Sequence, residues 1–262
     1  MKINSIKYYY SAFFLLLSMA FSFGQNLEEN LNLLLVREDK VAPDLADEYE
    51  MSLADLRDYL TENQIKGFNY FTHIKDDFQF THILPLNSLD ELNEGTRKAL
   101  IKKVNKPEME LIMDYFDLSL DSYIQYVVQY KPELSYVPSS QQWDEGNTYR
   151  KWHYYQFYPG SEDKVEEIFA AYKNLYKTKN VEMGFRVFAG FIGIERPTYI
   201  LTTWANSPLD YHQDLEKAST ILGDDGALLW SKLMEMVKEA KITEGWYLPQ
   251  YSYAPDTKLA EE

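Results

Sequence analysis

The sequence of 262 residues contains no cysteine, which excludes disulfides, cysteine-ligated zinc, iron–sulfur clusters and thiol nucleophiles. Positive charge is also scarce, because 26 basic side chains stand against 41 acidic ones and the formal net charge is −15. Phosphate binding needs a concentrated basic surface, so we expect no nucleic-acid partner. A glycine-rich phosphate loop is missing as well, since the nearest match, Gly190 to Gly193, lies in an apolar run and lacks the spacing.

Long apolar runs are few, and the one candidate lies at the N-terminus. Lys2 and Lys7 precede an apolar stretch from Tyr8 to Phe21, and small residues follow at 22 and 24. These three regions have the pattern of a secretory signal peptide, and the run is shorter than the roughly 20 residues that cross a bilayer. We predict a cleaved signal peptide over 1–24 and a periplasmic or secreted chain with no membrane span. The absence of cysteine excludes a bacterial lipoprotein anchor.

A weak internal repeat organises the rest of the chain. Lys66-Gly67-Phe68 matches Met183-Gly184-Phe185, and Thr81 to Leu84 matches Thr198 to Leu201. Such self-similarity is the mark of a duplicated structural unit. The expected organisation is a first unit at 25–130, a linker rich in Pro, Ser, Gln and Gly at 131–150, a second unit at 151–254 and a polar tail at 255–262.

Both units show the same order of strand and helix signals. In the second unit, an aromatic run at 152–158 predicts a strand, Pro159-Gly160 predicts a turn, and Ser161 precedes a helix with one apolar face. Ser207 followed by Pro208 is a strong helix start. The further elements expected in the second unit are strands at 185–192 and 198–204, a helix at 227–240 and a strand at 246–253. The elements expected in the first unit are strands at 32–37, 68–74, 78–86 and 123–130, with helices at 45–62, 90–104 and 108–116.

The order βαββαβ, found twice, predicts an α+β fold. Each unit would form a ferredoxin-like antiparallel sheet with both helices on one face. The other face is rich in aromatic side chains and has to be covered. We therefore expect two tandem ferredoxin-like βαββαβ units packed sheet to sheet as an intrachain pseudo-dimeric α/β barrel.

With this element order the mature chain resembles the dimeric α/β-barrel superfamily in a tandem form. Within it, the NIPSNAP and antibiotic-biosynthesis-monooxygenase-like domains are most similar, and the tandem arrangement is similar to the chlorite dismutase group. The resemblance covers the mature chain but rests on no invariant motif. It implies a fold and a shortlist: cofactor-free oxygenases, haem-binding proteins and proteins without an assigned activity.

Candidate ligand-binding residues come from the strands. If Phe185 and Val187 face the helices, strand alternation directs Arg186 and Phe188 into the barrel. A buried arginine there would need an acidic partner or an anionic ligand, and a solvated arginine at the barrel rim is the alternative. We also select the histidine of an aromatic strand and two residues at equivalent positions of the two units. The predicted ligand-binding set is His82, His153, Arg186, Phe188 and Tyr199.

No cofactor and no metal site is assigned from the sequence. If haem binds, His212 is the candidate ligand, and the alternative is an exposed histidine among acidic residues. His212 and Glu216 are spaced to hold a metal, but no third ligand is in view. Serine–histidine–aspartate sets and nucleophile elbows are missing, so a hydrolase is not expected.

Three functions remain open. The first is an exported small-molecule-binding protein that holds a hydrophobic or aromatic ligand between the two sheets. The second is an enzyme of the same superfamily, either a cofactor-free oxygenase or a haem protein. The third is a non-catalytic structural or interaction protein with a packed barrel. Whether the chain is an enzyme, and whether it assembles further, the sequence leaves open.

Overall fold

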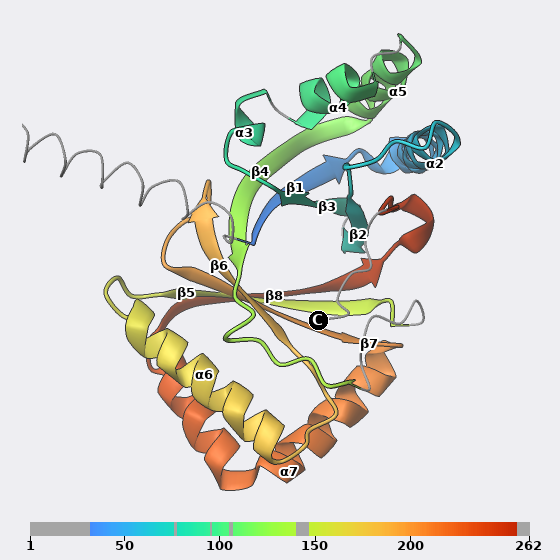
Figure 1. Ribbon diagram of the computed structural model, residues 1–262. Helices are drawn as coiled ribbons and strands as arrows, with labels where there is room; N and C mark the ends of the chain where they lie inside the picture. The colour runs from blue at the N-terminus through green and yellow to red at the C-terminus, as the bar shows by residue number, and fades with distance from the viewer. Residues whose placement is uncertain (1–31, 76–77, 95, 105–106, 140–146, 256–262) are drawn as a thin grey trace, which may run out of the picture.

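The computed structural model describes residues 32–75, 78–94, 96–104, 107–139 and 147–255. Within these ranges the strands form a closed antiparallel barrel in the order β1-β3-β2-β8-β5-β7-β6-β4 (Figure 1). The strands are β1 (Leu33–Val41), β2 (Phe71–Lys75), β3 (Gln79–Leu86), β4 (Leu120–Tyr130), β5 (Tyr149–Phe157), β6 (Arg186–Ile192), β7 (Thr198–Ala205) and β8 (Val237–Tyr247).

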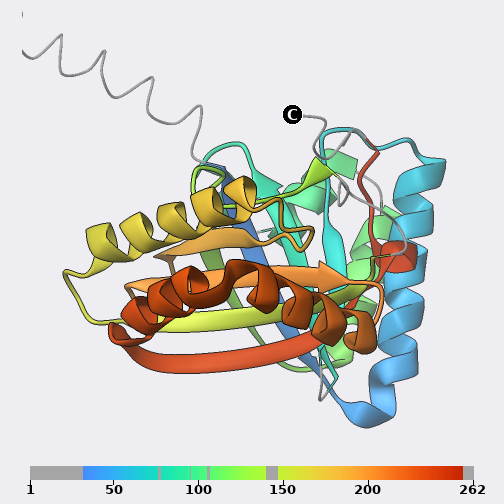
Figure 2. The same ribbon diagram turned by 90° about the horizontal axis from the view of Figure 1, so that it is seen from below.

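Helices cover the outside of the barrel in two groups on opposite sides, as Figures 1 and 2 show. The first group packs on β1 and β3, where Tyr49 and Leu53 share a core with Phe80. The second packs on β5, β6 and β7, where Phe169 shares a core with Val187. The helices are α2 (Ala46–Glu62), α3 (Glu91–Glu94), α4 (Thr96–Val104) and α5 (Pro107–Leu118) in the first group, and α6 (Glu162–Thr178) and α7 (Pro208–Met234) in the second, with short 3-10 helices at Pro43–Leu45 and Pro249–Tyr251.

The two halves of the chain contribute four adjacent strands each, in the same spatial order. The first half gives β4-β1-β3-β2 and the second gives β8-β5-β7-β6. Pairing of β2 with β8 and of β4 with β6 joins the halves edge to edge. At the first seam Gly245 lies opposite Lys75, and a Cβ at Gly245 would collide with the carbonyl oxygen of Ile74. Glycine therefore permits the close approach of the backbones that closes this seam.

Side chains from both halves occupy the interior of the barrel. Strand alternation sends every second residue inward, and the inward residues form one apolar cluster. This cluster comprises Val36, Tyr126, Val128, Trp152 and Ile200, with Leu34, Tyr154, Phe188 and Ile194 packed against it. The predicted inward direction of Phe188 is confirmed.

A buried ion pair lies beside this cluster. Lys75 Nζ donates to Glu38 Oε1 at 2.6 Å, and the hydroxyls of Tyr126 and Tyr154 donate to the same oxygen at 2.9 and 3.3 Å. Burial alone would raise the pKa of Glu38, but the Lys75 charge and these hydrogen bonds hold that pKa below its ordinary value. Since Glu38 and Lys75 belong to the first half and Tyr154 to the second, the pair ties the halves together.

Most expected strands and helices are confirmed, and the bounds of two elements near the C-terminus are wrong. The predicted hairpins correspond to β2–β3 and β6–β7. The helix predicted at 227–240 is helical as far as Met234, where α7 ends, so its C-terminal end is wrong. The strand predicted at 246–253 is misplaced, because β8 runs from Val237 to Tyr247. Lys238, Glu239 and Ala240 favour helix or are poor strand formers, but pairing with β5 overrides that local preference.

Several sequence-based expectations fall on residues outside the described ranges. These are the signal peptide at 1–24, residues 140–146 of the predicted linker and nearly all of the polar tail. The described part of the linker packs on the second half, where Leu134 joins the core beneath α6. Among the described residues, no helix combines the length and the apolar character that a bilayer crossing requires.

We predict that Gly245→Ala destabilises the fold by about 1–3 kcal/mol, because the new methyl group overpacks the β2–β8 seam. The measurement is the free energy of unfolding from urea titration. Ile242→Ala is the matched control on the same strand, because Ile242 is 54% exposed and its change should stay within about 0.5 kcal/mol. Equal effects of the two substitutions would contradict the proposed role of Gly245.

Removing one member of the buried ion pair should cost more than removing both. Lys75→Met leaves the Glu38 carboxylate buried without its counter-charge, which we expect to cost about 3–5 kcal/mol. The double variant Glu38→Leu/Lys75→Met should recover part of that loss. A double-mutant cycle in urea measures the coupling free energy, and additive single effects would argue against a strong pair.

Candidate functional site

One cavity, here called the second-half cavity, lies between the outer faces of β5 and β7 and the helices α6 and α7. Its volume is about 510 Å³. Most of its walls are aromatic or aliphatic, with Tyr155, Phe169 and Trp230 among the lining residues. No Asp, Glu, Lys or Arg is among the described residues that line it. The cavity is therefore suited to an uncharged, largely apolar molecule.

A bend in α7 shapes this cavity. Gly223, with φ 59° and ψ −146°, interrupts the helix in a backbone region that only glycine adopts easily. The bend frees the carbonyl of Leu222, which accepts a hydrogen bond from Lys179 Nζ at 2.7 Å. Tyr172 of α6 donates to the carbonyl of Gly226 at 2.8 Å. These two bonds hold α7 against the α6 side of the cavity on either side of the bend, which Figure 1 shows at the bottom of the molecule.

The polar side chains that line the second-half cavity are His153, Tyr155, Tyr172, Tyr176, Thr203, Tyr211 and Ser219. Two of them, His153 and Tyr155, are paired with each other. His153 Nδ1 lies 3.2 Å from the hydroxyl of Tyr155 on the same strand. Burial, with a smaller effect of Lys151, lowers the pKa of His153 to about 4. Burial also raises the pKa of Tyr155. Both side chains are therefore uncharged at pH 7.

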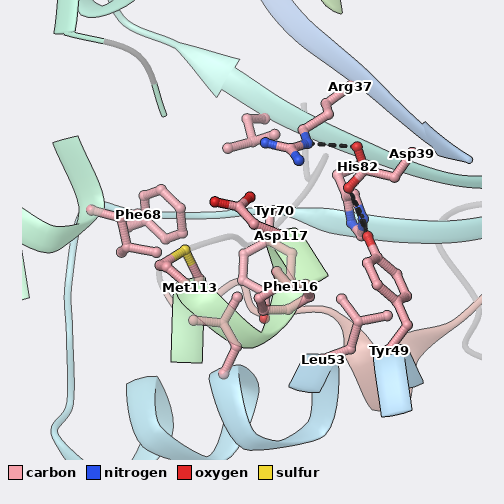
Figure 3. Close-up of a pocket in the computed structure, with 13 residues that line it drawn as sticks. Arg37, Asp39, Tyr49, Leu53, Phe68, Tyr70, His82, Met113, Phe116 and Asp117 are labelled. Carbon is pink, nitrogen blue, oxygen red and sulfur yellow. Dashed lines mark hydrogen bonds and ion pairs between the residues drawn. The ribbon is translucent and has the colours of Figure 1, made fainter. Parts of the chain in front are cut away.

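A smaller cavity of about 90 Å³, the first-half cavity, lies between β1, β3 and the helices α2 and α5. Figure 3 shows a polar wall carrying Arg37, Asp39 and His82, facing apolar side chains such as Phe68 and Met113. A space of this size holds a few waters or a small group of atoms. It is too small for a molecule with several rings.

A chain of hydrogen bonds runs along that polar wall (Figure 3). Arg37 Nε donates to Asp39 at 2.6 Å, and the Tyr49 hydroxyl lies 2.7 Å from Asp39 and 2.8 Å from His82 Nε2. His82 Nδ1 is 3.0 Å from the hydroxyl of Thr72. Burial lowers the pKa of His82 to about 4, although Asp39 opposes the shift. The chain fixes α2 on the sheet through Tyr49, which is wholly buried.

The structure distributes the predicted ligand-binding residues over four places. His82 lines the first-half cavity and His153 the second-half cavity. Tyr199 packs on Phe157 and Phe169 beneath α6, and its hydroxyl donates to Glu166 at 2.9 Å.

Arg186 and Phe188 share the inward face of β6. The guanidinium of Arg186 lies 4.5 Å from the centre of the Trp204 ring. No carboxylate of a described residue forms an ion pair with Arg186, which contacts the Trp204 ring and hydrogen-bonds to the side chain of Tyr130 instead. The five predicted residues thus do not form one site.

His212 does not line either cavity. It is an exposed residue of α7 whose ring contacts that of Tyr211, with 5.3 Å between centroids. Within the described part of the chain, no three His, Asp or Glu side chains are grouped to hold a metal ion. His212, exposed and outside both cavities, is not placed to hold a haem in either of them.

Sequence reasoning missed the residues that shape the two sites. Tyr49 of α2 contacts Asp39 and His82. Nothing in the sequence around Tyr49 distinguishes it from the other residues on the apolar face of that helix. Gly223 and Gly226 did carry a signal, because two glycines interrupt an otherwise continuous helical pattern. That signal points to a break in the helix and so to space beside it.

Comparison with solved structures shows the fold. An anthrone oxidase-like protein has a TM-score of 0.57 at 12% identity, with 90% of this chain and 98% of that chain covered. A candidate monooxygenase from Fusobacterium nucleatum has a TM-score of 0.58 at 14% identity, with coverage of 84% and 93%. Chlorite dismutase from Candidatus Nitrospira defluvii has a TM-score of 0.51 at 8% identity, with coverage of 83% and 91%. The chain thus has the dimeric α/β-barrel fold, as its element order predicts.

Comparisons at the level of sequence give no further assignment. No protein-family profile matches the chain, and no curated protein does.

We predict that stability falls as the pH drops from about 6.5 toward 4. Burial lowers the pKa values of His73, His82 and His153, so the unfolded chain takes up protons at a higher pH than the folded chain. The stability present above pH 6.5 is therefore lost on acidification through this window. Urea unfolding at several pH values measures the slope of the free energy of unfolding against pH.

A matched pair of variants tests the origin of this slope. His153→Gln should lower the slope of the unfolding free energy against pH by the contribution of about one proton, because one buried imidazole no longer titrates. His212→Gln changes an exposed histidine and should leave the slope as it is. The same slope in all three proteins would show that buried histidines do not cause the acid sensitivity.

Proposed function

We propose that this chain is an exported protein that binds a hydrophobic or aromatic small molecule in the second-half cavity. The observation that carries the proposal is the cavity itself, because about 510 Å³ lies within the range of roughly 300–1,000 Å³ typical of small-molecule sites. Its largely aromatic and aliphatic walls, with uncharged polar groups among them, match the composition of such sites.

The proposed location differs from the one expected from the sequence. We expected the ligand between the two sheets, inside the barrel. The inward side chains of Trp152 and Tyr126 and the Glu38–Lys75 pair occupy that interior. The outer face of the second sheet, by contrast, has a cavity beneath the bend of α7.

Export and tandem origin belong to the same proposal. The N-terminal pattern at 1–24 supports export through a cleaved signal peptide. The identical strand order of the two halves supports descent of the barrel from two ferredoxin-like units. A closer relationship to NIPSNAP domains is supported by element order alone.

Enzymatic activity of the oxygenase type is the second candidate. It is favoured by structural neighbours described as an anthrone oxidase-like protein and a candidate monooxygenase. Fold alone does not decide function. Consumption of oxygen in the presence of a bound ligand would separate this candidate from simple binding.

Ligand binding can be tested with N-phenyl-1-naphthylamine, an uncharged probe whose fluorescence rises in apolar surroundings. We expect the chain from Gln25 onward to bind it, and Ala227→Phe to weaken the Kd at least tenfold by filling part of the cavity. Ala240→Phe is the matched control, because Ala240 is exposed on β8 and does not line the cavity. No binding, or equal binding by both variants, would contradict the proposal.

A further inference from the structure

The pair His153 and Tyr155 places an imidazole in the wall of a cavity whose other polar side chains are the hydroxyls of Tyr172, Tyr176, Thr203, Tyr211 and Ser219. Both side chains lie on the outer face of β5, two residues apart, and their rings stack with centroids 6.0 Å apart and planes at 26°. The Tyr155 hydroxyl is 3.2 Å from His153 Nδ1. Tyr155 is 2% exposed, whereas His153 is only partly buried.

The partners available to the Tyr155 hydroxyl decide which nitrogen of His153 carries the proton. A phenol has one hydrogen to donate, and leaving it without an acceptor in a buried place is costly. The hydrogen bond seen for this hydroxyl is the one to His153 Nδ1. Tyr155 therefore donates and Nδ1 accepts. In a neutral imidazole the ring proton must then lie on Nε2.

His153 consequently presents an N–H donor at Nε2. No described residue forms a hydrogen bond with that atom, and His153 lines the second-half cavity. The cavity wall contains no charged residue within the described ranges, so a bound carboxylate would lose its hydration without gaining a counter-charge. The complementary ligand atom is thus an uncharged acceptor.

We propose that the second-half cavity binds a neutral aromatic ketone or aldehyde whose carbonyl oxygen accepts a hydrogen bond from His153 Nε2. This inference rests on the proposed function and adds the chemical class of the ligand. Aromatic walls such as Phe169 and Trp230 contact the ring system. Tyr155 is a positioning residue, because it acts on the ligand only through the tautomer of His153.

Two probes of nearly equal shape test the ligand class. 2-Acetylnaphthalene carries a carbonyl oxygen where 2-isopropenylnaphthalene carries a methylene group. One buried hydrogen bond contributes about 1 kcal/mol, so His153→Phe should weaken the binding of the ketone about fivefold and change that of the alkene less than twofold. His212→Phe, at an exposed histidine, is the control and should affect neither Kd.

The outcomes separate this inference from the proposed function. If both probes bind and His153→Phe changes their Kd values equally, the proposed ligand class is wrong while the cavity remains a binding site. If neither probe binds the unmodified chain, the proposed function fails and the inference fails with it.

The tautomer can be measured without any ligand. Nitrogen-15 NMR of His153 in the unmodified chain should show a protonated Nε2 and an unprotonated Nδ1. Tyr155→Phe keeps the ring packing and removes the hydrogen-bond donor. In this variant both neutral tautomers of His153 should be populated, and the additional substitution His153→Phe should weaken ketone binding by less than fivefold. A proton on Nδ1 in the unmodified chain would overturn the inference.

Discussion

Closure of the barrel is the constraint on which the rest of this structure depends. Each half supplies four strands, and neither half pairs its own outer edges, so β2 must meet β8 and β4 must meet β6. Gly245 allows the first of these contacts at the backbone. Inside the barrel, Glu38 accepts hydrogen bonds from residues of both halves. Packing and polar pairing thus hold the halves in one register.

Closure also determines where a ligand can be held. Side chains of both halves interdigitate in the interior, and the first-half and second-half cavities both lie outside the barrel, beneath the helices. The outer faces of the two four-stranded sheets differ in the side chains they carry. The first carries a hydrogen-bonded wall around Asp39 and His82 and a small cavity, whereas the second carries aromatic walls, the bend at Gly223 and a cavity large enough for a ring system.

The sequence reveals much of the fold because the signals are local. Ser207 begins α7 as the Ser207-Pro208 helix start predicts, by accepting a hydrogen bond from the Asp210 amide, and strand alternation places Phe188 inward. The end of α7 was not predictable, because residues 238–240 become strand only through pairing with β5. Of the site, His82 and His153 were identified as single residues. Their separation into two cavities depends on which side of the barrel each faces, and no local pattern contains that information.

Diffraction from crystals of the chain pressurised with xenon would test the central claim most directly, because xenon occupies apolar cavities without needing a specific ligand. We expect xenon in the second-half cavity, against Phe169 and Leu222, and none among the side chains inside the barrel. Xenon between the two sheets, with none beneath the bend of α7, would contradict it.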